Sequence, residues 1–307
     1  MTPDPHVFVV IPVHDRIEYT LACLESFSQQ TCPNVTVIVV DDGSTDGTKA
    51  VVQQRYPSTV VLSGDGSLWW AGATNRGVFW ALGRARAEDF VLTMNNDTVV
   101  SPGYVDSLLS VAREHPHTLI GSMAVDMGEE GRALDWGLRV RWWIGGSVRD
   151  VPPVAPFLDS PIPDCRAVDV LPGRGTLIPI GAFRALGPFD QTSLPHYGAD
   201  YEFSRRAYCH GFGLLINRAS IVRSHADATG LNPRLQKLGL LEFLRSFTSI
   251  RSHRSLLYTW RYSRLCLPPL QAAVFFVAMS VRNLVSGVRD QVRLRRGGTE
   301  GNVRAEK

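Results

Sequence analysis

The sequence predicts an α/β fold in which helices cover both faces of a mainly parallel sheet. Short apolar runs alternate with segments whose apolar residues recur at helical spacing, as strands and crossover helices do in such sheets. Two of the apolar runs end in polar clusters, Asp-Asp-Gly-Ser at 41–44 and Asn-Asn-Asp-Thr at 95–98. Ligands of open α/β sheets gather at the carboxyl ends of the strands, so the two clusters mark a predicted ligand-binding edge.

The elements follow one another in an order that fits this architecture. Apolar runs without helical periodicity are predicted strands, at 7–11, 35–40, 59–62, 90–94 and 119–124. The intervening segments with an apolar stripe are predicted helices, at 19–30, 44–52, 71–86 and 104–114. Pro12 ends the first strand, and Ser44 or Thr45 offers an N-cap for the second helix.

The second half of the chain is less regular. Residues 126–147 are predicted to form hairpins that carry Trp136, Trp142 and Trp143, and the proline-rich stretch 150–164 is predicted to be an extended connection. Further helices are expected at 176–186 and 200–209, and further short strands at 214–216 and 221–223.

Charge divides the chain into two parts. Residues 1–230 carry 18 Lys/Arg and 25 Asp/Glu, a net charge of −7, whereas residues 231–307 carry 14 and 4, a net charge of +10. We expect a body at 1–230 and a basic, partly apolar helical tail at 231–307, which could face anionic lipid or nucleic acid. The uncharged run 265–281 is interrupted by prolines and is shorter than the ~20 residues of a spanning helix. The tail is therefore expected to lie on a membrane surface rather than to cross the membrane, with an ordinary helical appendage or an oligomer contact as the alternative.

Cysteine usage and the start of the chain bear on its compartment. No two of the five cysteines have CxxC spacing, which favours reduced thiols over a zinc site or a disulfide framework. No Lys/Arg-led apolar segment opens the chain. A cytoplasmic location, with the tail at the inner membrane face, is the expectation.

Taken together, the motifs resemble the family 2 glycosyltransferases of the GT-A fold, and bacterial rhamnosyltransferases among them. The resemblance rests on VVDDGSTDGT at 39–48, LWWAGATNRG at 68–77, NNDT at 95–98 and GADYEFSRR at 198–206. It covers about residues 7–227, and the order and spacing of the motifs make it specific. It implies a Rossmann-like mixed sheet and inverting transfer of a sugar from a UDP- or dTDP-sugar to a hydroxyl, with Mg²⁺ or Mn²⁺.

The resemblance assigns the donor site. Asp42 corresponds to the carboxylate that accepts a hydrogen bond from the nucleobase, which suits the ring N3–H of uracil or thymine. Gly72 and Asn75 correspond to the pattern that backs the nucleotide, although helix packing remains an alternative for the glycine. For Asp42, helix capping is the structural alternative. The remaining expected donor contacts are Pro12, Val13, Asp15, Gly43, Asn95 and Asn96.

The resemblance also assigns the reaction centre. Asp97 corresponds to the second carboxylate of an Asp-x-Asp metal motif, in which Asn95 replaces the first, and His225 corresponds to a late His that serves some relatives as an extra ligand. Asp200 corresponds to the catalytic base that takes the acceptor proton. Ala199 departs from the family pattern, in which Glu is common at this position. The expected sugar and acceptor pocket contains Trp69, Trp70, His196, Tyr197, Glu202 and Arg206.

The expected partners are a nucleotide-sugar donor, a glycan or polyprenyl-linked acceptor of cell-wall or polysaccharide synthesis, and a membrane surface, but no nucleic acid. A nucleotidyltransferase would need a glycine- and basic-rich phosphate loop, and residues 12–16 contain no glycine. A catalytically lost GT-A-like module that binds carbohydrate or a partner is the non-enzyme alternative. The retention of Asp42, Asp97 and Asp200 argues against it.

Overall fold

The computed structural model describes residues 4–128, 133–135, 137–145, 147–149, 165–225, 240–249, 252 and 254–303. The chain divides into a first unit, residues 1–139 and 148–226, and a second unit, residues 140–147 and 227–307. The expected boundary at 230 lies outside the described residues, as do Trp136 and the expected connection at 150–164. Charge alone does not predict that 140–147 belongs with the C-terminal helices.

The first unit is built on a mixed sheet. The strands follow the order β10-β12-β6-β11-β4-β1-β2-β3, with β5 paired to β12 and β7 paired to β6. Their bounds are β1 Val7–Val13, β2 Val35–Asp41, β3 Val60–Ser63, β4 Phe90–Thr93, β5 Thr98–Val100, β6 Thr118–Asp126, β7 Ala133–Asp135, β10 Cys165–Ala167, β11 Thr176–Pro179 and β12 Gly213–Ser224. Strands β1 to β4 are joined by parallel pairing, whereas β11 runs antiparallel to both β4 and β6. The parallel β1–β4 region therefore carries the edge at which the polar clusters were expected.

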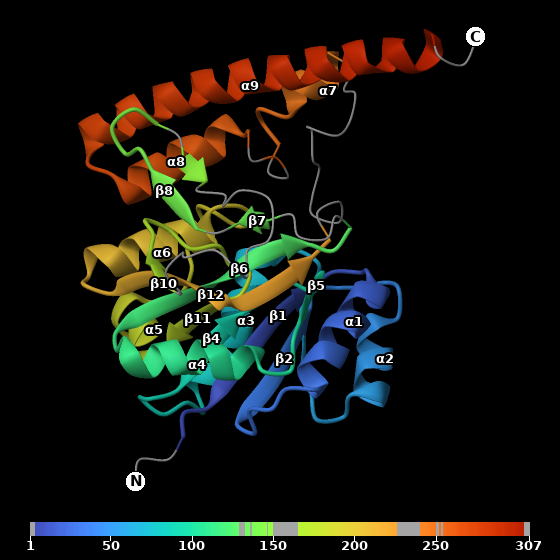
Figure 1. The fold of residues 1–307 in the computed structure, drawn as a ribbon, viewed down its shortest axis with the longest axis vertical. Helices are drawn as coiled ribbons and strands as arrows, with labels where there is room; N and C mark the ends of the chain where they lie inside the picture. Colours follow the sequence, from blue (N-terminus) through green and yellow to red (C-terminus); the bar gives the residue numbers. More distant parts are fainter. Residues whose placement is uncertain are drawn as a thin grey trace. The chain divides into compact units, whose positions relative to one another are not determined.

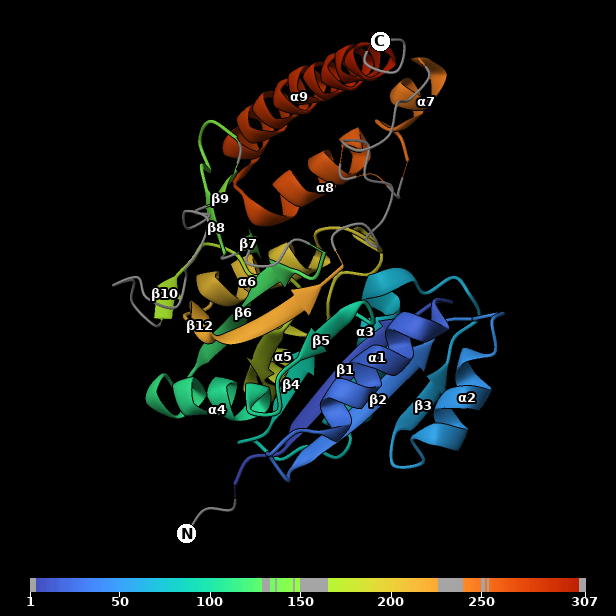
Figure 2. The same ribbon diagram turned by 45° about the vertical axis from the view of Figure 1, so that its right-hand side comes forward.

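Helices cover both faces of this sheet, as Figures 1 and 2 show. Their bounds are α1 Ile17–Ser28, α2 Thr48–Arg55, α3 Trp69–Leu82, α4 Tyr104–Glu114, α5 Ile180–Leu186 and α6 Ala199–Cys209. Val9 and Ile11 of β1 join a buried core with α1 and α4. Val10 points to the opposite face, where a Cβ added to Gly77 of α3 would come within 2.4 Å of its Cγ1. Strand alternation thus places neighbouring residues of β1 under different helices.

Several predictions about single elements are wrong. The expected helix at 176–186 is strand β11 followed by the shorter helix α5, because Thr176–Pro179 pairs with β4. The two short strands expected at 214–216 and 221–223 are one strand, β12, whose register shifts between Asn217 and Ile221. Helix α2 begins at Thr48 after Gly47, and Oδ1 of Asp46, rather than Ser44 or Thr45, accepts its first backbone N–H across 3.1 Å.

The second unit contains the helices α7 Leu240–Arg245, α8 Leu256–Cys266 and α9 Pro269–Val303. The strands β8 Leu138–Val140 and β9 Ser147–Arg149 form a separate two-stranded sheet. The prolines that were expected to interrupt the apolar run instead precede and open α9, because the first position of a helix needs no N–H donor. By length and composition, residues 269–294 of α9 could cross a membrane; soluble core helices pass the same test, so this is weak evidence.

Candidate active site

The carboxyl ends of the parallel strands meet at one edge of the sheet. Val13, the last residue of β1, lies opposite Asp41, the last residue of β2, and Pro12 lies opposite Val40. The backbone N–H of Asp42 donates to the carbonyl oxygen of Val13 across 2.8 Å. The structure therefore brings Pro12, Val13 and Asp42 together, as parallel pairing predicts.

Asp42 is buried under the loop that leads into α3. Its Oδ1 accepts the backbone N–H of Gly66 (2.8 Å), and its Oδ2 accepts those of Leu68 (3.0 Å) and Trp69 (3.1 Å). A side chain on Gly43 would meet the same loop, because its Cβ would lie 2.9 Å from the nitrogen of Gly66. The carboxylate thus caps the start of α3. A bond from Asp42 to a nucleobase stays a prediction.

Asp15 ties the loop after β1 to the loop after β2. Its backbone N–H donates to Oγ of Ser44 (2.8 Å), and its Oδ1 accepts the backbone N–H of Thr45 (2.8 Å). The hydroxyl of Ser44 therefore serves this link, not the N-terminus of α2 as the sequence suggested. Both loops border the strand-end edge and are fixed relative to each other.

The Asn-Asn-Asp turn joins β4 to β5 at the same edge. Asn96 donates through Nδ2 to Oγ1 of Thr20 on α1 across 3.1 Å. Asn95 accepts at Oδ1 the indole Nε1–H of Trp70 across 3.1 Å. These amides hold the turn between α1 and α3, and Asp97 follows them directly.

Asp97 is the buried carboxylate of this edge. It is 3% exposed, and its Oδ1 has no hydrogen-bond partner among the described residues. Pairing of Thr98 with Ser224 brings the end of β12 alongside, and the backbone N–H of His225 donates to the carbonyl oxygen of Asp97 across 3.3 Å. The ring of Tyr19 packs edge-on to His225, with centroids 4.8 Å apart. The structure therefore places the two expected metal ligands next to each other.

Two arginines that the sequence analysis missed act on Asp97. Burial raises the pKa of the Asp97 carboxyl, and the positive charges of Arg174 and then Arg16 partly offset that effect. Arg174 donates through Nη1 to Oγ of Ser224 across 3.1 Å. Arg16 is exposed and precedes α1 with a left-handed φ of 65°. The one sequence feature that could have indicated Arg174 is its place between two glycines at 173 and 175. For Arg16, the only such feature is its position just after a predicted strand.

Trp70 connects the turn to the catalytic side of the site. Its ring packs edge-on to Phe189, with centroids 5.4 Å apart. A Cβ on Gly173 would lie 2.2 Å from Cζ2 of Trp70, so only glycine lets the ring lie this close to the backbone. With its N–H bonded to Asn95, Trp70 packs as an internal brace, and its contact with a sugar stays a prediction.

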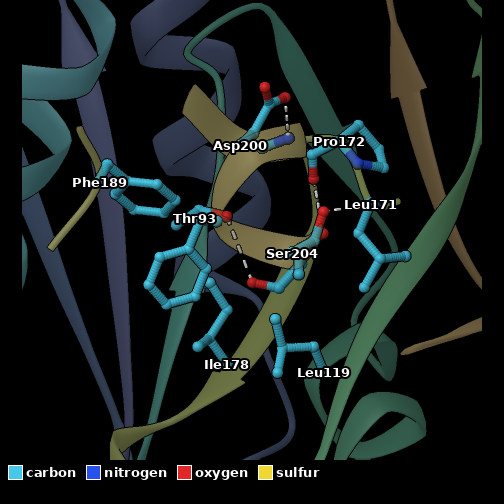
Figure 3. Close-up of a pocket in the computed structure, with 11 residues that line it drawn as sticks. Thr93, Leu119, Leu171, Pro172, Ile178, Phe189, Asp200 and Ser204 are labelled. Carbon is cyan, nitrogen blue, oxygen red and sulfur yellow. Dashed lines mark hydrogen bonds between the residues drawn. The ribbon is translucent and has the colours of Figure 1, made fainter. Parts of the chain in front are cut away.

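Asp200 lies in the first turn of α6, after Gly198 with a left-handed φ of 78°. Its Oδ2 accepts the backbone N–H of Gly173 (2.7 Å), and its Oδ1 accepts that of Tyr201 (2.9 Å). Below the carboxylate is a small hollow, shown in Figure 3, with Asp200 at one end and Leu119 and Ile178 at the other. Most of the lining is apolar, so the hollow is unsuited to a diphosphate and serves as packing space beneath Asp200.

Trp69, His196 and Tyr197 form an aromatic cluster beside the start of α3. Ring centroids are 5.4 Å apart for Trp69 and His196 and 4.4 Å apart for His196 and Tyr197. Trp69 has a left-handed φ of 56°, which is uncommon for a bulky residue and frequent at functional sites. Burial raises the pKa of Tyr197. Three of the expected pocket residues therefore lie together.

The structure gives the remaining expected residues internal partners. Asn75 is 1% exposed; it donates through Nδ2 to the carbonyl oxygen of Phe189 (2.9 Å) and to Oε1 of Gln191 (2.8 Å), and accepts the N–H of Phe189 (3.0 Å). Gly72 lies next to them, since its Cβ would be 3.7 Å from Oε1 of Gln191. Both Asn75 amide hydrogens are therefore used within the fold, and its contact with a donor stays a prediction.

Glu202 and Arg206 form a bidentate ion pair along α6. Nε and Nη2 of Arg206 donate to the two carboxylate oxygens of Glu202 across 2.8 and 3.0 Å. Arg206 also donates to the carbonyl oxygen of Leu186, the last residue of α5, and to that of Pro188, which follows the helix. Arg206 therefore joins α5 to α6, and a role for the pair in acceptor binding stays a prediction.

A divalent metal was expected at this edge. Within the part of the chain that the structure describes, no group of three or more His, Cys, Asp and Glu gathers closely enough to hold one. Asp97 nevertheless fits as a protein ligand, because it offers a buried carboxylate oxygen without a partner. Mg²⁺ and Mn²⁺ sites commonly take one or two carboxylates and fill the other positions with substrate phosphates and water.

Comparison with known proteins places these features in a family. The model of glycosyl transferase family 2 matches residues 8–167. N-acetylglucosaminyl-diphospho-decaprenol L-rhamnosyltransferase of Mycobacterium tuberculosis (strain ATCC 25618 / H37Rv) is 27% identical over 229 residues, 68% of this chain and 73% of the relative. Validoxylamine A glucosyltransferase of Streptomyces hygroscopicus subsp. jinggangensis is 24% identical over 281 residues, 80% of this chain and 62% of the relative.

Two solved structures share the fold. The crystal structure of GalNAc-T7 with UDP, GalNAc and Mn²⁺ matches with a TM-score of 0.60 and 14% identity, over 86% of this chain and 48% of that one. S. aureus TarS matches with a TM-score of 0.54 and 16% identity, over 91% of this chain and 54% of that one. This chain spans about half the length of each.

The mixed sheet is therefore that of a GT-A glycosyltransferase, a class that uses nucleotide-sugar donors. The family model covers more than half of the sequence, and the chain belongs to glycosyl transferase family 2.

Proposed function

We propose that this chain is an inverting glycosyltransferase that moves a sugar from a UDP- or dTDP-sugar to a hydroxyl of a glycan or lipid-linked acceptor. One observation carries the proposal: a buried, unpartnered carboxylate oxygen, on Asp97, lies at a strand-end edge under the charge of Arg174 and Arg16. Removing a carboxylate from water is unfavourable unless a cation or a ligand stabilises its negative charge. A buried carboxylate oxygen without a partner therefore marks a functional site.

In the proposed reaction, Asp200 is the general base. It takes the proton of the acceptor hydroxyl as that oxygen attacks the anomeric carbon, and the bond from that carbon to the diphosphate breaks on the opposite side. The nucleoside diphosphate leaves with the bonding electron pair. The Gly173 amide fixes Asp200, which keeps the base in one orientation while the acceptor binds.

Cationic side chains stabilise the departing diphosphate in this scheme. Arg174 and Arg16 supply positive charge at the Asp97 edge, where diphosphate oxygens are expected to lie. A divalent ion held by Asp97 and His225 would neutralise further charge on the diphosphate when bound. The relative GalNAc-T7, crystallised with UDP and Mn²⁺, supports the use of such an ion.

The names of the relatives support a narrower class of donor and acceptor. The mycobacterial relative is described as a rhamnosyltransferase that acts on a decaprenyl-diphosphate-linked sugar, which supports a dTDP-linked deoxyhexose donor and a polyprenyl-linked acceptor. An acceptor of that class supports a role in cell-wall or polysaccharide synthesis at the cytoplasmic side of a membrane. The aromatic cluster of Trp69, His196 and Tyr197 offers apolar ring faces on which a sugar can stack.

The test is a thermal-shift panel of UDP, dTDP, GDP and CMP, each with and without Mn²⁺. A ligand that binds the folded state raises its melting temperature. We expect a Mn²⁺-dependent shift with one pyrimidine diphosphate, abolished by Asp97→Ala and retained by Asp200→Asn. With the matching sugar donor, Asp200→Asn is expected to lower donor turnover by ~10²–10⁴-fold. The absence of any nucleotide shift would instead favour a module that has lost catalysis.

A further inference from the structure

The exposed apolar side chains of this protein are concentrated in the second unit. Nineteen large apolar side chains are exposed among the described residues, and only Phe79, Met127 and Tyr208 belong to the first unit. Apolar residues scattered singly on a surface need no explanation, but a contiguous patch marks an interaction site. The second unit therefore requires a separate functional account.

Helix α9 carries more of these exposed apolar side chains than any other element described, and they form one continuous stripe along it. Its exposed members are Leu270, Val274, Val277, Val281, Leu284, Val285, Val288 and Val292. Successive members are mostly three or four residues apart, so they lie on one face of the helix. At ~1.5 Å per residue the stripe extends over roughly 33 Å. It is too long and too regular to be incidental exposure.

The opposite face of α9 is already occupied by its own unit. Phe275 is buried and stacks on Trp142, with ring centroids 6.1 Å apart. Towards the C-terminus, Asp290 pairs with the buried Arg254 across 2.8 Å between Oδ2 and Nη2. Figure 1 shows α9 lying along α7 and α8 within this unit. The stripe is therefore the outward face of a packed helical unit.

Charge on α9 decides what fits this face. Arg282, Arg289 and Arg293 are exposed, and helical spacing places them along one border of the stripe. The only carboxylate between residues 269 and 294 is Asp290, which Arg254 already pairs. A second copy packed stripe to stripe would bring arginine rows to one seam without carboxylates on these segments to face them. A surface of anionic lipid offers hydrocarbon for the stripe and phosphates for the arginines.

We propose that α9 lies in the headgroup region of an anionic membrane, with its valine and leucine stripe buried and its arginine row on the lipid phosphates. A spanning orientation would carry Arg282, Arg289 and the Arg254–Asp290 pair into hydrocarbon, which charged groups avoid. The α8 helix has exposed Leu256, Leu257 and Trp260 that can enlarge the contact. This inference concerns where the enzyme works, and it does not depend on the proposed sugar chemistry.

The test is cosedimentation of the full chain with vesicles of phosphatidylcholine alone or mixed with phosphatidylglycerol. We expect binding to the anionic vesicles that weakens on the order of 100-fold in the triple variant Arg282→Gln, Arg289→Gln, Arg293→Gln. The matched control, Arg55→Gln, Arg84→Gln, Arg113→Gln, removes the same charge from exposed positions of the first unit and is expected to bind like the wild type. The double variant Val277→Asn, Val281→Asn is expected to lose binding while keeping its melting temperature.

Four outcomes would overturn the proposal. If the matched control lost vesicle binding to the same extent, the effect of the arginines would be one of non-specific charge. If the wild type bound neutral and anionic vesicles equally, the arginines would have no role in binding. Resistance of the bound protein to carbonate at high pH would indicate a spanning helix. A stable dimer in solution that Val277→Asn, Val281→Asn dissociates, without lipid binding, would assign the stripe to a second copy. Asp200→Asn is expected to bind vesicles normally, which separates this result from any failure of the catalytic proposal.

Discussion

The backbone N–H of Gly173 donates to Oδ2 of Asp200 across 2.7 Å, and the positive charge of the next residue, Arg174, acts on Asp97 more strongly than that of Arg16. One dipeptide before β11 therefore acts on both carboxylates of the proposed mechanism. Trp70 lies over Gly173 and donates to Asn95, which completes the connection between the two sides of the site. A small displacement of this dipeptide would change the position of the base and the electrostatics of the donor edge together.

The substitution Gly173→Ala tests this connection. Its new Cβ would lie 2.2 Å from Cζ2 of Trp70, so the ring or the backbone must move. Overpacking of this kind costs about 1–3 kcal/mol of stability, and we expect a lower melting temperature together with a lower turnover number. Gly181→Ala is the matched control, because its Cβ would meet nothing within 4 Å. Equal effects of the two substitutions in melting and activity assays would contradict the proposed role of Gly173.

Arg174→Gln is expected to weaken the binding of nucleoside diphosphates. A charge-assisted hydrogen bond contributes about 1.5–3 kcal/mol, which corresponds to at least a tenfold rise in the dissociation constant measured by calorimetry. Binding of the nucleoside alone should change little, because the diphosphate carries the charge. Arg184→Gln on α5 is the control; that arginine donates to the carbonyl oxygen of Ala85, away from the carboxylates. A loss shared equally by nucleoside and diphosphate would exclude a specific phosphate contact.

Asp97→Asn is expected to stabilise the metal-free protein while removing donor binding. Because burial raises the native pKa of Asp97 above its ordinary value of 3.8, the folded state binds the proton more tightly than the unfolded state. The free energy of unfolding of the wild type therefore falls as pH rises from 3.8 through the raised pKa, and the asparagine variant lacks this fall. Melting curves should coincide below that window and separate above it, with the variant higher. A lower melting temperature of the variant at neutral pH would contradict this account.

Asn75→Ala distinguishes a packing role from a donor contact. The change leaves the N–H and carbonyl groups of Phe189 without their amide partner, and each buried polar group left unpaired costs about 1–3 kcal/mol. We expect a large fall in the denaturation midpoint and a nearly unchanged KM for the donor in the folded enzyme. Gln191→Ala should cost less, because that residue is exposed. A tenfold rise in KM without loss of stability would restore Asn75 to the donor site.

The alternation of apolar runs and helical stripes was enough to predict β1, β2, β4 and the helices between them, because parallel strands buried on both faces leave a continuous apolar signal. The strand β11 was mistaken for the start of a helix, since a short apolar run fits either structure until its pairing is known. Its pairing with β4 exists only in the folded sheet. The prolines before α9 were misread for a related reason: proline breaks a helix interior but is suited to its first position.

The sequence by itself determined the class of fold, the edge that carries Asp42 and Asp97, and the place of Asp200 near the start of a helix, because these depend on local patterns and motif order. Only the tertiary structure decided what those groups touch. In the folded chain, Asp42 accepts hydrogen bonds from the loop before α3, and Asn75 accepts one from the backbone N–H of Phe189. The charge of Arg174 acts on Asp97. The bond between Asn75 and Phe189 joins residues 114 positions apart, and local periodicity in the sequence cannot predict a contact over that distance.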